Sequence, residues 1–563
     1  MINAATMTRT SSLLFLFLML AATSASGQRR RAPEPKPKPQ PRLQRTDTTI
    51  RSATLEVYQQ FEPELKPISK PELAPGLPPP PPGLTAQQYD VPQQTLYYSY
   101  RALPLRPLAL GTADTAPAAP SNYALLGGGN LSTILGEVGI GSLRGRDWQT
   151  ALQARYITQE GADMKDQIFR SFKLRGDGSL RRKDHIFEAG LDAQRDVFGA
   201  YGYDHDAQKY SLDYVKRVYT GAAVTLGAQN EQPAAMGIFY HPVVSFSYFT
   251  GTVLNSEQTL SLSLPVRKEV DSNLSAEVGI NAWITSSNID GAAWSNNIYQ
   301  LTPRISYKRE RFSGHFGLYP TKAGSYHLLP DIAASYRIGN YTALASAGWK
   351  AGFTQNTIKQ LTKANPFIQV SGDYRQTRTD EVFAGLSLAL GKHLSLTGRA
   401  SWNQWQNLPL FITAPASDGK DFNILYDQQV QALVWNADLR YAIGEDFSLG
   451  AEGAWYNYYQ HSYSRVWGEP GVRLKGSANW LPVSGLVVTV YAEVLDRIWG
   501  QDAQGREVKL KGVFELGAAT EYTIIERLNL FIRAENLLGL RNERWLGYPS
   551  FGFNIYGGAR FRF

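Results

Sequence analysis

The densest group of potential metal ligands in the sequence is the run Asp204-His205-Asp206. Two carboxylates and an imidazole could together hold a divalent cation. On a β-strand, however, successive side chains point to opposite faces, so His205 would be separated from both aspartates. A single site would need a loop, where a solvated run without metal is the commoner outcome. We therefore predict no metal site and no bound cofactor.

The other residue types give little support to catalysis. The seven histidines are scattered, and the sequence contains no nucleophile motif, phosphate-binding loop or zinc-type spacing. Cysteine is absent, which excludes disulfides, thiol chemistry and a lipid anchor attached through cysteine. Ser–His or Asp–His pairs that meet only in the folded chain leave no sequence pattern. We predict that the protein is not an enzyme.

The C-terminal segment, Phe551 to Phe563, indicates what kind of element positions these residues. Every odd-numbered position in it is apolar or glycine, whereas even-numbered positions carry Asn554, Arg560 and Arg562. A strand with one apolar and one polar face is typical of a transmembrane β-barrel, with lipid outside and water inside. We therefore expect this segment to be a barrel strand.

The aromatic carboxy-terminus predicts a location and two partners. Phe561 and Phe563 are similar to the terminal signal that the outer-membrane barrel-assembly machinery reads on its substrates. We predict that the chain lies in the cell outer membrane and contacts that machinery and outer-membrane lipid.

The same alternation recurs after residue 120. Apolar side chains occupy every second position in four clear examples, 274–282, 394–402, 447–455 and 528–534. Runs of about ten residues suit tilted transmembrane strands. A soluble sandwich has shorter strands, and a propeller would show a repeated blade motif. We predict an all-β fold, a transmembrane antiparallel β-barrel of about 16–22 strands.

The connections between these runs are of two kinds. Short turns such as 338–340, 391–393 and 444–446 alternate with long polar connections, which are 354–372, 414–421 and 496–507. Short turns at one end and long loops at the other are typical of the periplasmic and outer sides of a barrel. The 31 tyrosines, 24 phenylalanines and 12 tryptophans would supply aromatic girdles at the two membrane interfaces.

The first 27 residues predict export. Arg9 supplies a positive start, Leu13–Ala22 a short apolar core and Ala25-Ser26-Gly27 a small-residue cleavage site. An apolar run of about ten residues is too short to span a bilayer. Residues 1–27 are therefore predicted to be a signal peptide.

Residues 28–120 differ in composition from the rest. They hold 19 of the 31 prolines and few large apolar residues. Proline cannot donate to a β-ladder, so we predict a mostly disordered, extended periplasmic tail, followed by the barrel over 121–563. Residues 28–70 contain ten Lys or Arg and five Asp or Glu, so most of the net charge of +8 lies there. No basic domain face remains to indicate nucleic acid.

Four arginines are predicted to face the lumen. They are Arg399, Arg533, Arg560 and Arg562. Unpaired, they would favour anionic solutes. Glu452, Glu515 and Glu535 lie on nearby predicted strands, and we favour charge pairing between the two sets.

The order of elements near the C-terminus also resembles a known family. Leu530–Leu538, which contains Asn536-Leu537, is followed by Gly547-Tyr548-Pro549 and by Gly557–Phe563. This order is similar to the C-terminal end of TonB-dependent receptors. Further segments are similar to short, plugless members of that family: Pro104–Leu108, Asn122-Tyr123, Gly127–Asn130, Ala200–Tyr203 and Asn365–Phe367. The resemblance implies a 22-stranded barrel and solute transport.

The N-terminal region departs from that family. A typical receptor has a globular plug of well over a hundred residues, which the 93 proline-rich residues 28–120 cannot build. Thr54-Leu55-Glu56-Val57 resembles the short segment through which such receptors contact TonB, with Thr54 and Val57 at the defining positions. An ordinary extended segment is the alternative.

Solute transport across the outer membrane is the leading functional prediction. The alternative is a non-transporting structural or assembly barrel. Such a barrel would hold a periplasmic protein or the cell wall through residues 28–120, whereas a transporter could contact TonB through them.

Overall fold

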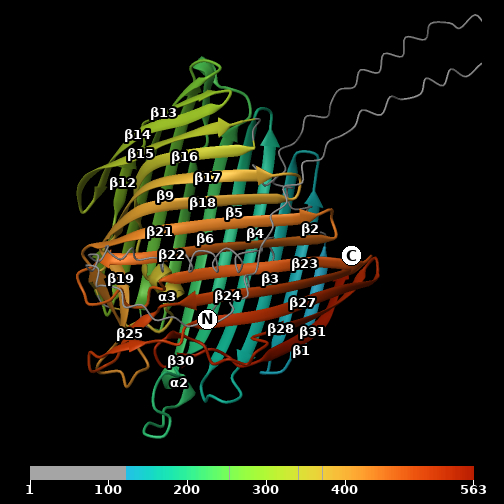
Figure 1. Ribbon diagram of the computed structural model, residues 1–563, viewed down its shortest axis with the longest axis vertical. Coiled ribbons are helices and arrows are strands. Elements are labelled where there is room, and N and C mark those ends of the chain that lie inside the picture. Colours follow the sequence, from blue (N-terminus) through green and yellow to red (C-terminus); the bar gives the residue numbers. More distant parts are fainter. Residues whose placement is uncertain (1–121, 253, 340–341, 371) are drawn as a thin grey trace, which may run out of the picture. The chain divides into compact units, whose positions relative to one another are not determined.

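The computed structural model describes residues 122–563 except 253, 340–341 and 371. The predicted signal peptide, the proline-rich tail and Thr54–Val57 lie outside the described residues. The described part of the chain is an antiparallel β-barrel closed on itself (Figure 1).

The elements are as follows. In chain order the barrel strands are β1 (Tyr123–Gly129), β2 (Ile134–Arg144), β3 (Trp148–Glu160), β4 (Ile168–Arg182), β5 (His185–Gly199), β6 (Lys216–Asn230), β7 (Ile238–Tyr240), β8 (Val243–Gly251), β9 (Leu254–Glu269), β10 (Leu274–Ile289), β11 (Ala292–Ser295), β12 (Ile298–Leu301), β13 (Arg304–Arg309), β14 (Phe312–Ala323), β15 (Ser325–Ile338), β16 (Ala343–Thr354), β17 (Thr377–Leu390), β18 (Leu394–Gln406), β21 (Val430–Ile443), β22 (Phe447–Gln460), β23 (Val472–Val483), β24 (Leu486–Asp496), β27 (Val513–Ile525), β28 (Leu528–Glu535) and β31 (Asn554–Arg562). The connections contain the hairpins β19 (Leu408–Thr413) with β20 (Phe422–Asp427), β25 (Trp499–Gln501) with β26 (Glu507–Lys509) and β29 (Glu543–Trp545) with β30 (Tyr548–Pro549), and the short helices α2 (Leu212–Val215), α3 (Ile358–Ala364) and η2 (Ala235–Gly237).

The barrel has 22 strands, because two of them are interrupted. β7 and β8 both pair with β9 and together form one strand. β11, β12 and β13 pair in turn with β10 and also form one strand. β1 pairs with β2 on one side and β31 on the other, which closes the ring. The predicted fold class is confirmed, at the upper end of the predicted strand number.

The two faces of the strands separate apolar from polar side chains as expected. On β28, Leu530 and Ile532 are 44% and 53% exposed, whereas the alternate residues Asn529 and Phe531 are buried. The exposed set faces the lipid in a membrane, and the other set faces the lumen. No helix in the described ranges is long and apolar enough to cross a bilayer.

The closing strand is shorter than expected. β31 begins at Asn554 rather than at Phe551, because Phe551 to Phe553 belong to the preceding loop. Within it, Phe561 is outward and 47% exposed, whereas Asn554 and Tyr556 are buried on the inner side. The predicted alternation of this strand is therefore confirmed.

The two ends of the barrel differ in the length of their connections. Short turns follow β2, β4, β15, β17, β21, β23 and β27, and β31 ends beside the start of β1, where the Phe563 amide donates to the Asn122 carbonyl. The connection predicted at 414–421 is the tip of hairpin β19–β20, whereas the one predicted at 496–507 contains β25 and the first residue of β26. Both hairpins stand outside the barrel sheet.

Candidate functional site

Five long connections at one end of the barrel pack together. They are residues 161–167, 200–215, 355–376, 407–429 and 536–553, and we call them the loop cap. A single buried cluster draws side chains from four of them and includes Tyr201, Leu361, Phe367, Phe422 and Tyr548. Loops that share a hydrophobic core are held as one unit rather than moving independently.

Aromatic rings form the centre of this cluster. Phe367 stacks on Tyr548 with ring centroids 3.9 Å apart, and Tyr201 lies 4.9 Å from Tyr548. Trp545 meets Phe411 edge-on at 5.1 Å. All five side chains are buried. Aromatic pairs in such arrangements stabilise beyond the area they bury.

Backbone hydrogen bonds interlock two of the loops. The Phe422 amide donates to the Phe367 carbonyl at 2.9 Å, and the Gln369 amide donates to the Phe422 carbonyl at 2.8 Å. Ile368 and Phe422 thus form a parallel bridge between segments that lie far apart in the sequence.

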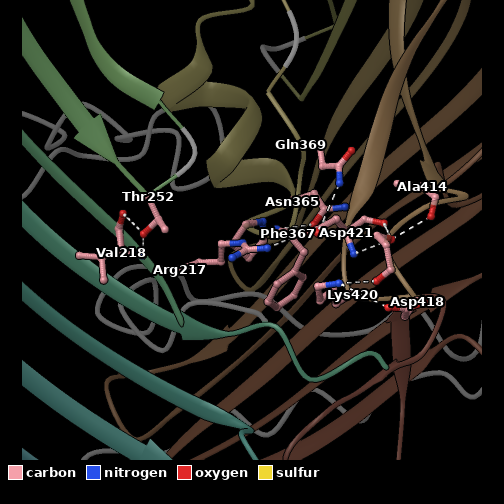
Figure 2. A network of polar contacts seen from close by, with 12 residues as sticks. Arg217, Val218, Thr252, Asn365, Phe367, Gln369, Ala414, Asp418, Lys420 and Asp421 are labelled. Carbon is pink, nitrogen blue, oxygen red and sulfur yellow. Dashed lines mark hydrogen bonds and ion pairs between the residues drawn. The ribbon is translucent and has the colours of Figure 1, made fainter. Parts of the chain in front are cut away.

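A buried ion pair anchors the cap to the barrel wall (Figure 2). Arg217 of β6 donates to Asp421, 2.5 Å away, and the two side chains are 10% and 6% exposed. Gln369 also donates to Asp421, at 3.5 Å. A buried charge that loses its partner is costly, so this pair fixes the 407–429 loop against β6.

Tyrosine hydroxyls make further links within the cap. Tyr201 donates to the Pro549 carbonyl at 2.8 Å, and Tyr548 donates to the Lys420 carbonyl at 2.5 Å. Burial raises the pKa of both tyrosines. The hydrogen bond from Tyr210 to Asp418, with burial and the nearby carboxylate charge, raises the pKa of Tyr210 to about 12. The cap is therefore built for neutral tyrosines.

Helix α3 is pinned at its N-terminus. Glu257 of β9 accepts hydrogen bonds from the Ile358 and Lys359 amides at 2.6 and 3.1 Å, and the Thr357 side chain accepts from the Gln360 amide. A carboxylate at this position satisfies amides that have no partner within the helix and is favoured by the helix dipole. Glu257 therefore holds the 355–376 loop on the barrel wall.

A chamber of ≈ 780 Å³ lies beneath the cap. Phe367, Trp545 and Tyr548 of the cap contribute to its lining, together with residues of β3–β5 and of β22, β23, β24, β27 and β28. β4 and β5 (teal) and β24 and β27 (orange) stand on opposite sides of the barrel (Figure 1). The chamber is thus part of the lumen, bounded at the outer end by the loop cap.

The chamber walls carry opposite charges. Glu452, Glu493, Glu515 and Glu535 line it from β22, β24, β27 and β28, with Lys475 of β23 among them. Lys173 lines it from β4 and Lys359 and Lys363 line it from α3, with Asp196 of β5 beside them, and Arg544 lines it from β29 in the cap. A volume of about 300–1,000 Å³ with a few convergent polar groups is typical of a small-molecule site.

The four predicted arginines lie on the inner sides of their strands, and three of them are ion-paired. Arg399 pairs with Glu381 at 2.6 Å, and Arg560 and Arg562 pair with Glu521 at 2.7 and 3.9 Å. Arg533 lies 5.6 Å from the centre of the Phe531 ring. The partners are therefore Glu381 and Glu521, not the glutamates named from the sequence, because strand register determines which charges meet. None of the four arginines lines the chamber.

The Asp204-His205-Asp206 run lies in the loop cap. One Asp204 oxygen accepts from the Asp206 and Ala207 amides, and the His205 ring packs on Tyr203 with ring centroids 4.1 Å apart. No group of three potential metal ligands is found among the residues that the structure describes.

Most residues of the site carry no recognisable pattern in the sequence. Arg217, Asp421, Glu257 and the chamber lysines belong to no motif. Arg217 is 204 residues from Asp421 in the sequence, and Glu257 is 101 residues from Ile358. One sequence pattern did point to the cap. Ala200–Tyr203 and Asn365–Phe367 are similar to segments of plugless receptors, and both contribute residues to the cap core.

Solved siderophore receptors and iron transporters share the fold of this barrel. No family model and no curated protein matches the sequence. Among solved structures, the siderophore receptor PirA from Acinetobacter baumannii matches with a TM-score of 0.62 at 9% identity, over 79% of this chain and 80% of that one. The iron transporter FrpB from Neisseria meningitidis matches with 0.61 at 9% identity, over 81% and 83%.

A third neighbour was solved with its ligand. The pyoverdine outer-membrane receptor FpvA from Pseudomonas aeruginosa, bound to pyoverdine, matches with a TM-score of 0.59 at 12% identity, over 78% of each chain. At identities this low, the TM-scores show a common fold and nothing further. The barrel type and strand number implied by the resemblance to TonB-dependent receptors are therefore confirmed.

Proposed function

We propose that the protein carries a solute across the outer membrane, with the chamber as its binding compartment and the loop cap as its outer gate. The observation that supports this proposal is a chamber of ≈ 780 Å³ inside a closed barrel, with aromatic cap residues in its lining. Neighbours of the same fold are named as receptors and transporters. These names support transport rather than catalysis as the function.

Transport requires the cap to move. The stacked rings and the Arg217–Asp421 pair must separate before a solute can enter from the loop side. TonB would supply the energy for this movement through contact with the Thr54–Val57 segment. Residues 28–120 would then lie on the periplasmic side.

The alternative, a barrel that holds a periplasmic partner through residues 28–120, has one observation in its favour. The cap core is well packed, as a permanently sealed barrel would require. Unpaired charges in the chamber favour transport, since a sealed structural lumen gains nothing from them.

Ion conductance in planar bilayers tests the proposal. We expect the full chain to conduct little and a variant with residues 408–427 replaced by a short turn to conduct strongly, because the cap then loses Phe411, Asp421 and Phe422. Shortening the β25–β26 tip at 502–505, which lies outside the cap, is the matched control and should leave conductance unchanged.

Two further results would separate transport from the alternative. A lumen that stays sealed in the shortened-cap variant contradicts transport. A stable complex with a periplasmic protein other than TonB, lost on deletion of residues 28–120 while conductance is unaffected, would favour the structural role.

A further inference from the structure

The chamber combines two charged walls of predominantly opposite sign. We infer that it binds a zwitterionic solute of the short-peptide class, with the amino end on the glutamate wall and the carboxylate end on the lysine wall. This inference rests on the proposed transport function and names its class of solute.

The glutamate wall carries more negative charge than its own cations neutralise. Glu452, Lys475, Glu493 and Glu515 are direct cross-strand neighbours in one row across β22, β23, β24 and β27. Lys475 pairs with Glu493 at 3.3 Å. Glu515 has no cation within ion-pair distance in the described part of the chain, and it stands directly opposite Glu493. Like charges at directly opposite positions destabilise a sheet.

Glu535 extends this wall with neutral partners. It accepts hydrogen bonds from Tyr556, Asn554 and Gln159 at 2.8, 3.0 and 3.2 Å. These donors fix the carboxylate without neutralising it. The wall as a whole therefore offers a place for a cation, and an ammonium group has the three donors to satisfy several carboxylate oxygens at once.

The lysine wall has the complementary arrangement. Lys173 projects from β4, and Lys359 and Lys363 project from α3, which Glu257 holds in place. Across the ranges that the structure describes, none of these three ammonium groups has a carboxylate within ion-pair distance. Asp196, which also lines the chamber, accepts from Ser171 at 2.6 Å. A carboxylate or other anion can therefore bind this wall directly.

Charges on both walls restrict the class of solute. A multiply anionic complex would meet the uncompensated glutamates, and a polycation would meet the lysines. A molecule with a cation at one end and an anion at the other satisfies both walls. The aromatic residues Phe367, Trp545 and Tyr548 leave room for apolar side chains between the two ends.

Calorimetric titration of the purified full chain in detergent micelles tests the inference with three probes: trialanine, N-acetyl-trialanine and trialanine amide. We expect acetylation and amidation each to weaken binding at least about tenfold, because each removes a charge-assisted hydrogen bond. The Glu515→Gln variant should bind N-acetyl-trialanine with nearly the same affinity as trialanine. The Lys363→Gln variant should bind trialanine amide with nearly the same affinity as trialanine.

Matched controls lie in the short turns at the other end of the barrel. Glu526→Gln and Lys392→Gln change the same charges on exposed residues and should bind all three probes as the parent chain does. Equal affinity for trialanine and its two blocked forms would overturn the inference, as would no binding of trialanine at all.

The conductance measurement keeps the two proposals apart. If the shortened-cap variant conducts and trialanine does not bind, transport stands and the peptide class is wrong. If no variant conducts, transport itself is contradicted, whatever the titrations show.

Discussion

At the scale of single residues, the charges of the loop cap divide into buried and exposed pairs. Arg217 and Asp421 are almost fully removed from solvent, whereas Arg375 and Asp373, in the same cap, are 44% and 65% exposed at 2.8 Å. Burial removes the competition of water for both partners, so the first pair depends on complete neutralisation and the second does not.

Replacing Asp421 by asparagine should open the cap. The Arg217 charge would remain buried without its partner, which is expected to lower the free energy of cap opening by about 3–5 kcal/mol. Amide hydrogen exchange over residues 366–369 and 407–429 measures this. Asp373→Asn is the control and should lower it by less than about 1 kcal/mol. Similar exchange rates in the two variants would contradict the assignment.

Tyr210 makes the cap sensitive to alkaline pH. Its hydrogen bond to Asp418, burial and the nearby charge raise its pKa to about 12, above the unfolded value of about 10. A raised pKa contributes stability that is complete below about pH 10 and is lost as the pH rises towards 12. Exchange protection of the cap should therefore fall over that interval.

Tyr210→Phe isolates this contribution. The variant should have a less protected cap at neutral pH and a weaker fall between pH 10 and 12. Tyr214→Phe, on the same segment and 59% exposed, should keep the fall of the parent chain. An unchanged fall in Tyr210→Phe would show that other buried tyrosines, such as Tyr201 and Tyr548, account for it.

At the scale of elements, the ring closes through strands that approach more closely than side chains allow. A Cβ atom added to Gly558 of β31 would lie 1.9 Å from the Leu126 carbonyl oxygen and 2.6 Å from the Gly127 Cα atom of β1. Both obstacles are backbone atoms, which cannot rotate away. Glycine at this position therefore permits the pairing of β1 with β31.

Gly558→Ala should weaken the closure of the barrel. Relief of the overlap requires a backbone shift, which we expect to cost about 1–3 kcal/mol. The measurement is the temperature at which the folded barrel loses its heat-modifiable mobility on gels. Gly398→Ala is a stringent control, since a Cβ atom there meets nothing within 4 Å. An equal loss in both variants would assign the effect to strand propensity.

The strands could be predicted from the sequence and the loop cap could not, for a physical reason. Alternation along β28 and β31 is imposed by lipid on one side and water on the other, so each strand carries its own signal. Cap contacts such as Phe367 with Tyr548 join residues from separate loops with no periodicity. The chamber charges of Glu493 and Glu515 depend on register, which local sequence does not specify.

At the scale of the whole molecule, the two ends of the described chain meet. The backbone amide of Phe563 donates to the Asn122 carbonyl at 3.0 Å, and the Phe561 and Phe563 rings stack 6.3 Å apart on the outside of the barrel. Both rings are about half exposed, at 47% and 58%. They contribute little to internal packing and are accessible from outside the barrel.

Changing Phe561 and Phe563 together to alanine should therefore impair assembly in cells more than stability. We expect the amount of heat-modifiable barrel in the outer membrane to fall at least about tenfold, whereas the denatured chain should refold in detergent as the parent does, since lipid-facing truncations lose little internal packing. Phe553→Ala, 40% exposed in the outer loop, is the matched control and should assemble normally. Refolding that fails to the same extent as assembly would show that the two rings stabilise the β1–β31 seam rather than acting as a signal.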